Sequence, residues 1–271
     1  FCISMKSSYY KYFAALLLFG SNGIVASNIN LPSYEIVLLR LLLGSLFLIT
    51  VFTVSRQRFT FYRNKHTCLY LFISASAMGA SWMLLYEAYQ QVGISIASLA
   101  YYCGPVIVMI LSPFLFRETL TWPKIAGFLT VLAGMCLVNL QALDEGKTIW
   151  GLFCGLMSAF MYALMVTANK KTKPESGLEN SLLQLVIGSF IVVAFVSMQK
   201  NFVLSLTTID WIPVLLLGLL NTGIGCYLYF SSITDLPVQT VAICGYLEPL
   251  SAVVFSVLFL HEVLLPLQML G

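Results

Sequence analysis

Residues 102–127 read YCGPVIVMILSPFLFRETLTWPKIAG, and residues 246–271 read YLEPLSAVVFSVLFLHEVLLPLQMLG. A shift of 144 residues superposes the two stretches without a gap. Among the residues that coincide are Tyr102 with Tyr246, Pro105 with Pro249, Ser112 with Ser256, Glu118 with Glu262, and Gly127 with Gly271. Gly, Pro and Glu seldom align by chance at one fixed spacing, so the pattern indicates an internal repeat.

The same shift extends upstream along the chain. It also superposes Glu35 on Glu179, Gly44-Ser45 on Gly188-Ser189, and Gly79 on Gly223. The repeat therefore divides the sequence into a first half, residues 6–140, and a second half, residues 149–271.

The composition shows what surrounds this repeat. Hydrophobic residues make up 59% of the 271 residues and charged residues only 9%, whereas about a quarter of the residues in a soluble domain are charged. Such a chain lies in lipid, and its continuous apolar runs exclude a β-barrel and predict helices of about 20 residues per crossing. The runs lie at 12–29, 33–54, 68–89, 95–116, 123–140, 149–168, 180–198, 211–231 and 238–260, with a tenth from Pro266 that ends at Gly271 and is expected to be truncated.

The number of runs and the placement of charge predict how the chain crosses the membrane. Each half carries five runs, so the second half would enter with the opposite orientation, as in inverted-repeat transporters. Eleven of the fourteen Lys and Arg residues lie on the side of the N-terminus, and basic loops favour the cytoplasm. The predicted fold is an all-α integral membrane protein of ten transmembrane helices in two inverted five-helix repeats, with a cytoplasmic N-terminus.

Several function classes are excluded by motifs that the sequence lacks. No basic helix carries interleaved aromatic residues, which excludes a nucleic-acid partner. The seven cysteines form no CxxC pair, so no metal site or disulfide is expected. Neither a phosphate-binding loop with its lysine nor an HExxH or GxSxG motif is present. We therefore expect no cofactor and no enzymatic activity.

The repeated stretches resemble the EamA-type transporters of the drug/metabolite transporter superfamily, which have ten helices in two five-helix repeats. The residues that carry the resemblance are Pro105, Glu118, Gly127 and Gly134 in the first half, Glu248, Pro249, Glu262 and Gly271 in the second, and Arg40. The resemblance implies transport of small metabolites, often amino acids and frequently outward. It also implies a cavity around helices one, three, four, six, eight and nine.

Ionisable side chains inside apolar runs are candidates for function. Glu248 lies near the middle of its run beside Pro249, and the equivalent position of the first half is the uncharged Gly104. Glu248 would hold a substrate amine or cycle a proton, or it would instead bond a neighbouring helix. Glu87, near the end of the third run, is a candidate for coupling or gating, with simple solvation as the alternative.

Other residues are expected to serve the scaffold, namely Arg40, Pro105, Glu118, Pro249 and Glu262. Arg40 lies about two turns into the second run, where its side chain can pair with Glu35 or with a carbonyl group. Glu118 and Glu262 follow their runs and would cap the ends of adjacent helices. Pro249 frees a backbone carbonyl and can break its helix.

Aromatic and amide side chains would line the cavity. The residues predicted to bind substrate are Asn22, Trp82, Tyr86, Tyr101, Tyr162, Asn221, Tyr246 and Glu248, with Tyr102, Asn169, Tyr227 and Tyr229 in a wider set. Trp82 and Tyr86 are four residues apart and therefore share a helix face. Helix packing and interhelical hydrogen bonding are alternative explanations of the same residues.

Together these features predict a secondary transporter of the plasma membrane, the inner membrane of a bacterium. It would export a small metabolite, such as an amino acid or a related amphipathic compound, by alternating access between its halves. A receptor or scaffold that binds a ligand without moving it is the alternative. The expected partners are the lipid bilayer and a small-molecule substrate. The sequence leaves open whether protons are coupled to transport and which oligomeric state the protein adopts.

Overall fold

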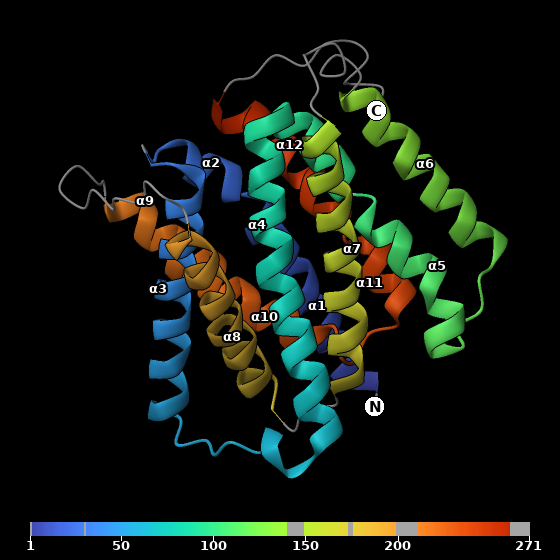
Figure 1. The fold of residues 1–271 in the computed structure, drawn as a ribbon. Coiled ribbons are helices and arrows are strands. Elements are labelled where there is room, and N and C mark those ends of the chain that lie inside the picture. Colours follow the sequence, from blue (N-terminus) through green and yellow to red (C-terminus); the bar gives the residue numbers. More distant parts are fainter. Residues whose placement is uncertain (1, 30, 140–148, 173–175, 199–210, 261–271) are drawn as a thin grey trace.

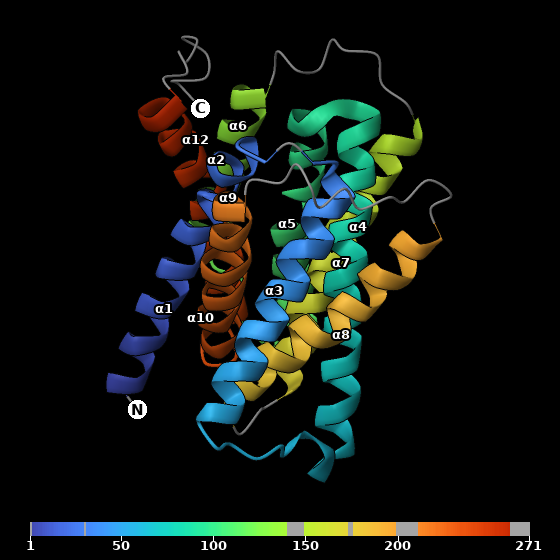
Figure 2. The same cartoon turned by 90° about the vertical axis from the view of Figure 1, so that its left-hand side faces the viewer.

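A computed structural model describes residues 2–29, 31–139, 149–172, 176–198 and 211–260. Every regular element in these ranges is a helix, and the long helices lie side by side in a bundle (Figures 1 and 2). The elements are α1 (Cys2–Gly20), α2 (Asn22–Ser27), α3 (Ser33–Val54), η1 (Phe61–Arg63), α4 (Lys65–Tyr101), α5 (Gly104–Phe116), α6 (Trp122–Asn139), α7 (Ile149–Thr172), α8 (Gly177–Ser197), α9 (Trp211–Leu215), η4 (Leu216–Ile224), α10 (Gly225–Ser232), α11 (Val238–Cys244) and α12 (Leu247–Leu260). The all-helical prediction is confirmed for this part of the chain.

Seven stretches of the described chain are long and apolar enough to cross a membrane. They are Tyr34–Val54, Lys65–Val92, Ile96–Phe116, Ile149–Thr172, Gly177–Ser197, Trp211–Ser232 and Val238–Phe259. The protein is therefore a multi-pass membrane protein. The first expected run forms α1 and α2, and the fifth forms α6, but neither is among the seven stretches. The tenth expected run and Glu262 lie outside the described residues. The ten-helix arrangement stays a prediction.

The first run is interrupted at Ser21, which the sequence did not predict. Its hydroxyl donates a hydrogen bond to the carbonyl of Leu18 at 2.7 Å. Such local bonds compete with the regular helix ladder. The chain therefore leaves α1 at Gly20 and starts the short helix α2 at Asn22.

The boundary between the third and fourth runs also lies at another place than expected. A connection was expected near residues 90–94, but α4 continues to Tyr101 and the chain breaks at Tyr102 and Cys103. In the second half, the matching break at Gly245 and Tyr246 separates α11 from α12. Pro105 and Pro249 lie in the first turns of α5 and α12, where a missing N–H group costs no helical hydrogen bond. The prolines thus fix where these helices begin.

The eighth run is continuous from α9 through η4 to α10, but η4 is a π-helix. The hydroxyl of Thr222 donates to the carbonyl of Leu217, five residues earlier, at 2.8 Å. The amide of Asn221 donates to the carbonyl of Leu18 at 2.9 Å and to the side chain of Asn22 at 3.0 Å. Widened turns of this kind occur frequently at functional sites. This one ties the break between α1 and α2 to the middle of the bundle.

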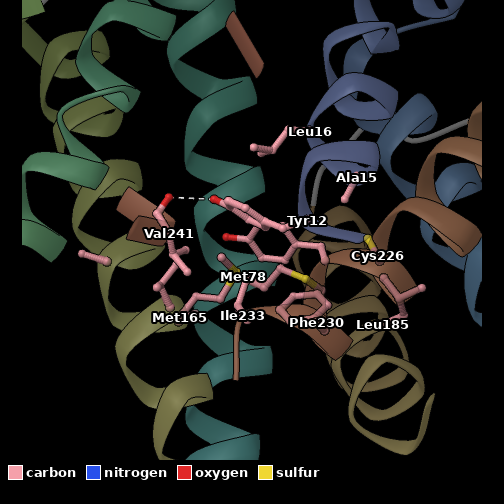
Figure 3. Close-up of a cluster of buried hydrophobic side chains, with 14 of the residues drawn as sticks. Tyr12, Ala15, Leu16, Met78, Met165, Leu185, Cys226, Phe230, Ile233 and Val241 are labelled. Carbon is pink, nitrogen blue, oxygen red and sulfur yellow. Dashed lines mark hydrogen bonds between the residues drawn. The ribbon is translucent and has the colours of Figure 1, made fainter. Parts of the chain in front are cut away.

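The centre of the bundle is a buried cluster around Tyr12 (Figure 3). The Tyr12 side chain is fully buried, and its hydroxyl donates to the carbonyl of Val241 at 2.7 Å. Met78, Met165 and Phe230 pack around it from α4, α7 and α10. The N-terminal end of the bundle also carries the connection of residues 55–64 (Figure 1).

Two acidic side chains join the halves at the N-terminal end. Glu118, which follows α5, accepts hydrogen bonds from the backbone N–H groups of Val238 and Gln239 at 2.7 and 3.0 Å. These are the first two residues of α11, so Glu118 caps that helix. Glu179 of α8 accepts from the backbone N–H of Phe61 at 2.9 Å and from the hydroxyl of Thr60 at 2.6 Å.

Candidate functional site

A cavity of about 690 Å³ lies in the half of the bundle away from the N-terminus. Residues of α1, α2, α3, α4, α7, η4, α10 and α12 line it. The polar and aromatic members of the lining are Phe19, Asn22, Ser27, Arg40, Trp82, Tyr86, Tyr89, Gln90, Ser98, Tyr101, Tyr102, Tyr162, Tyr229, Phe230 and Glu248. Nine of the 27 lining residues carry an aromatic ring and most of the others are apolar, with few polar groups, as in typical small-molecule sites.

The structure brings together most of the residues that the sequence predicted to bind substrate. Asn22, Trp82, Tyr86, Tyr101, Tyr162 and Glu248 all line the cavity. Asn221 and Tyr246 lie behind the lining and support it. Asn221 holds α1 and α2 through its amide, and the hydroxyl of Tyr246 donates to the carbonyl of Tyr102 at 2.8 Å.

Arg40 is part of the cavity wall, although the sequence indicated a scaffold role. Its side chain is buried, and its Nε donates to the hydroxyl oxygen of Thr222 at 2.9 Å. The guanidinium carbon lies 4.5 Å from the centre of the Trp82 ring, a distance at which a cation is attracted to the ring face. The bond to Thr222 uses one of the five N–H donors of the guanidinium. Arg40 is thus held in position while it borders the cavity.

Glu248 is the second residue of α12 and is half-buried at the cavity wall. Its backbone carbonyl accepts a bond from the hydroxyl of Ser251 at 2.8 Å. Within the described ranges, no side chain donates a hydrogen bond to its carboxylate. Among the lining residues that the structure describes, Glu248 is the one acid and Arg40 the one base. The cavity therefore carries two opposite charges in an aromatic surrounding.

The tyrosines form a connected group rather than separate contacts. The rings of Tyr101 and Tyr162 meet edge to face with their centres 5.5 Å apart. The hydroxyls of Tyr162 and Tyr229 lie 3.4 Å from each other. Tyr89 packs edge to face on Tyr86 at 5.2 Å. Tyr89 was not singled out in the sequence, although it lies seven residues after Trp82 and therefore on the same helix face.

Glu87 follows the lining residue Tyr86 on α4 but does not itself line the cavity. Its carboxylate accepts hydrogen bonds from the hydroxyl of Tyr34, from the amide of Gln91 at 3.3 Å, and from the indole N–H of Trp150 at 3.4 Å. These bonds join α3, α4 and α7. The structure thus gives Glu87 a role in joining helices, while a role in coupling or gating stays a prediction.

Comparison with known proteins places these features in a family. The model of the EamA-like transporter family matches residues 7–140 and again residues 149–271. The chain is 27% identical to the uncharacterized transporter YxxF of Bacillus subtilis (strain 168), over 92% of this chain and 80% of that protein. It is 27% identical to the threonine/homoserine exporter RhtA of Escherichia coli (strain K12), over 86% of this chain and 76% of that protein.

A solved crystal structure shares the fold with a TM-score of 0.84 and 17% sequence identity, and the match covers 97% of this chain and 92% of the other. The family matches and the names of the relatives indicate a transporter rather than an enzyme. The resemblance seen around Pro105 and Pro249 is therefore confirmed, and the chain belongs to the EamA-like transporter family.

Proposed function

We propose that the protein exports an amino acid or a closely related zwitterionic metabolite by alternating access between residues 6–140 and 149–271, arranged as inverted repeats. The observation that carries this proposal is the placement of one guanidinium, Arg40, and one carboxylate, Glu248, on the wall of an aromatic cavity. Charges inside a membrane are costly, and those that persist mark substrate or ion pathways.

A zwitterion fits these two charges better than a cation or an anion does. The guanidinium of Arg40 would bind the carboxylate of the solute through paired N–H donors. Glu248 would accept hydrogen bonds from its ammonium group. Either charge left alone in a dry site costs several kcal/mol, whereas a zwitterion compensates both. The aromatic wall then receives the side group, and a volume of about 690 Å³ admits a small metabolite.

We propose the outward direction on the basis of the orientation of the chain and of one relative. Lys and Arg residues concentrate on the side of the N-terminus, which favours a cytoplasmic location for that end. The cavity lies in the opposite half and would therefore face the outside, in the state that releases an exported solute. The name of RhtA, a threonine/homoserine exporter, supports both the class of solute and the direction.

Counterflow in liposomes tests this proposal. The purified protein is reconstituted, the liposomes are loaded with unlabelled L-threonine, L-homoserine or another member of an amino-acid panel, and uptake of the matching radiolabelled compound is followed. We expect saturable exchange of at least one zwitterionic compound and none of its decarboxylated amine. Binding without exchange would instead identify a receptor. Repeating the assay at two internal pH values shows whether protons drive accumulation.

A further inference from the structure

Three amide side chains are fully buried in the bundle and do not line the cavity. Asn169 of α7 and Asn180 and Gln184 of α8 each have 0% exposed surface. The Asn169 amide donates to Asn180 at 3.2 Å, and the Asn180 amide donates to the carbonyl of Phe230 at 3.1 Å. Asn180 and Gln184 are four residues apart and share one face of α8. We call these three residues the amide cluster.

Gln184 differs from the other two because neither polar atom of its amide has a partner in the part of the chain that the structure describes. Buried amides in membrane proteins commonly hold helices together by hydrogen bonds, and the bonds of Asn169 and Asn180 do this. The same explanation fails for Gln184. An unpaired buried polar group costs about 1–3 kcal/mol, and an apolar residue of similar shape would avoid that cost.

The amide cluster lies between the cavity and the N-terminal end of the bundle. Phe230 and Cys226 line the cavity, and Leu185, the neighbour of Gln184, packs beside them (Figure 3). One turn after Gln184, Gly188 lies so close to Met78, another lining residue, that an added Cβ would be 2.6 Å from the Met78 Cε. On the other side of the cluster, Asn169 precedes Lys170 in sequence.

Lys170, near the end of α7, lies on the side of the amide cluster away from the cavity. Its ammonium donates to the backbone carbonyl of Thr234 at 2.6 Å, in the connection between α10 and α11. The cluster therefore continues from the inner surface of the cavity toward the N-terminal end of the bundle. A path that opened on this side would pass the amides.

The internal repeat gives Gln184 a specific counterpart. The shift of 144 residues superposes Gln184 on Arg40, and Arg40 borders the cavity. In an inverted-repeat transporter the two halves exchange roles as the site opens to the other side. The position equivalent to Arg40 would then border the path from the N-terminal side.

From this geometry we propose that Gln184, together with Asn180 and Asn169, lines the solute path when the N-terminal end opens, and that the Gln184 amide hydrogen-bonds the zwitterionic solute there. This inference rests on the proposed function. A neutral amide carries both donors and acceptors, so it can contact the carboxylate or the ammonium group without adding a charge. The solute would be passed along this side by uncharged groups and held in the cavity by Arg40 and Glu248.

Accessibility of a thiol at this position tests the path without any knowledge of the solute. Gln184→Cys is prepared in oriented membrane vesicles, and a membrane-impermeant methanethiosulfonate reagent is added on the side of the N-terminus. Modification is read residue by residue by mass spectrometry, so the native cysteines can remain. Ser45→Cys is the matched control, because Ser45 is also buried without a partner among the described residues but does not line the cavity. We expect modification of Gln184→Cys at least about tenfold faster than that of Ser45→Cys. Equal protection of both thiols would overturn the proposal.

A transport measurement supplies the second test. Gln184→Leu should keep or raise the melting temperature, since it removes an unpaired amide, and should slow exchange of radiolabelled L-threonine, or of the panel compound that wild type exchanges, by about tenfold, the equivalent of one hydrogen bond. Ser45→Ala should leave exchange unchanged. Wild-type rates in Gln184→Leu, or in Gln184→Met if the first variant does not fold, would refute the contact. A wild-type protein that exchanges no solute would refute the proposed function, and the thiol experiment would still show whether the path exists.

Discussion

Replacing Arg40 with lysine isolates the contribution of the guanidinium group, because the positive charge is kept. Lysine lacks the planar fork that bonds Thr222 through Nε at 2.9 Å while its other donors border the cavity. The variant should lose one charge-assisted hydrogen bond to the solute carboxylate. A bond of this kind contributes about 1.5–3 kcal/mol. Its loss should raise the solute concentration that gives half-maximal counterflow by about 10- to 150-fold.

The assay is the concentration dependence of exchange in liposomes, with the melting temperature measured on the same preparation. Thr222→Val serves as the matched control, because it removes the hydroxyl that accepts the Arg40 hydrogen bond but keeps the guanidinium. It should raise the half-saturation concentration less than Arg40→Lys does. An Arg40→Lys protein with wild-type half-saturation would show that Arg40 does not contact the solute. A much lower melting temperature with an unchanged half-saturation concentration would show that Arg40 stabilises the fold and does not bind the solute.

Three further predictions concern other parts of the molecule. Glu248→Gln should reduce exchange of zwitterionic solutes at least about tenfold at normal protein levels, since it removes the charge that compensates an ammonium group; unchanged exchange by a normally expressed variant would exclude that role. Glu118→Ala removes the acceptor at the start of α11 and should lower the free energy of unfolding by about 0.5–2 kcal/mol, and an unaltered denaturation midpoint would contradict the capping role. Gly79→Val should destabilise the contact of α4 with α8 by about 1–3 kcal/mol, because even a Cβ would lie 2.9 Å from the backbone oxygen of Gly188; a thermal melt identical to that of wild type would show that the two helices can separate.

Much of the cavity could be predicted because helix faces follow from spacing. Trp82 and Tyr86 lie four residues apart on α4, and both line the cavity. Pro249 predicts an interruption within the run of residues 238–260, and the chain breaks between α11 and α12 just before it. In each of these cases the deciding interaction is local in sequence, so the pattern of residues determines the outcome.

The hydrogen-bond partner of Arg40 could not be predicted, because the contact joins distant segments. Its partner Thr222 lies 182 residues away on the π-helix, and nothing in the apolar run of residues 211–231 reveals a widened turn. The break at Ser21 was missed for a related reason. It is stabilised in part by the amide of Asn221, which reaches α1 and α2 from the same π-helix.

The two acidic contacts at the N-terminal end of the bundle are reciprocal. Glu118 of the first half binds the backbone of residues 238 and 239, and Glu179 of the second half binds the backbone of residues 60 and 61. A backbone N–H group is present in every residue except proline. During evolution the side chains at positions 61, 238 and 239 can therefore drift without loss of the backbone contact, while Glu118 and Glu179 cannot, and Thr60 adds a hydroxyl bond to Glu179. Related sequences should show constant acids facing variable but proline-free partners.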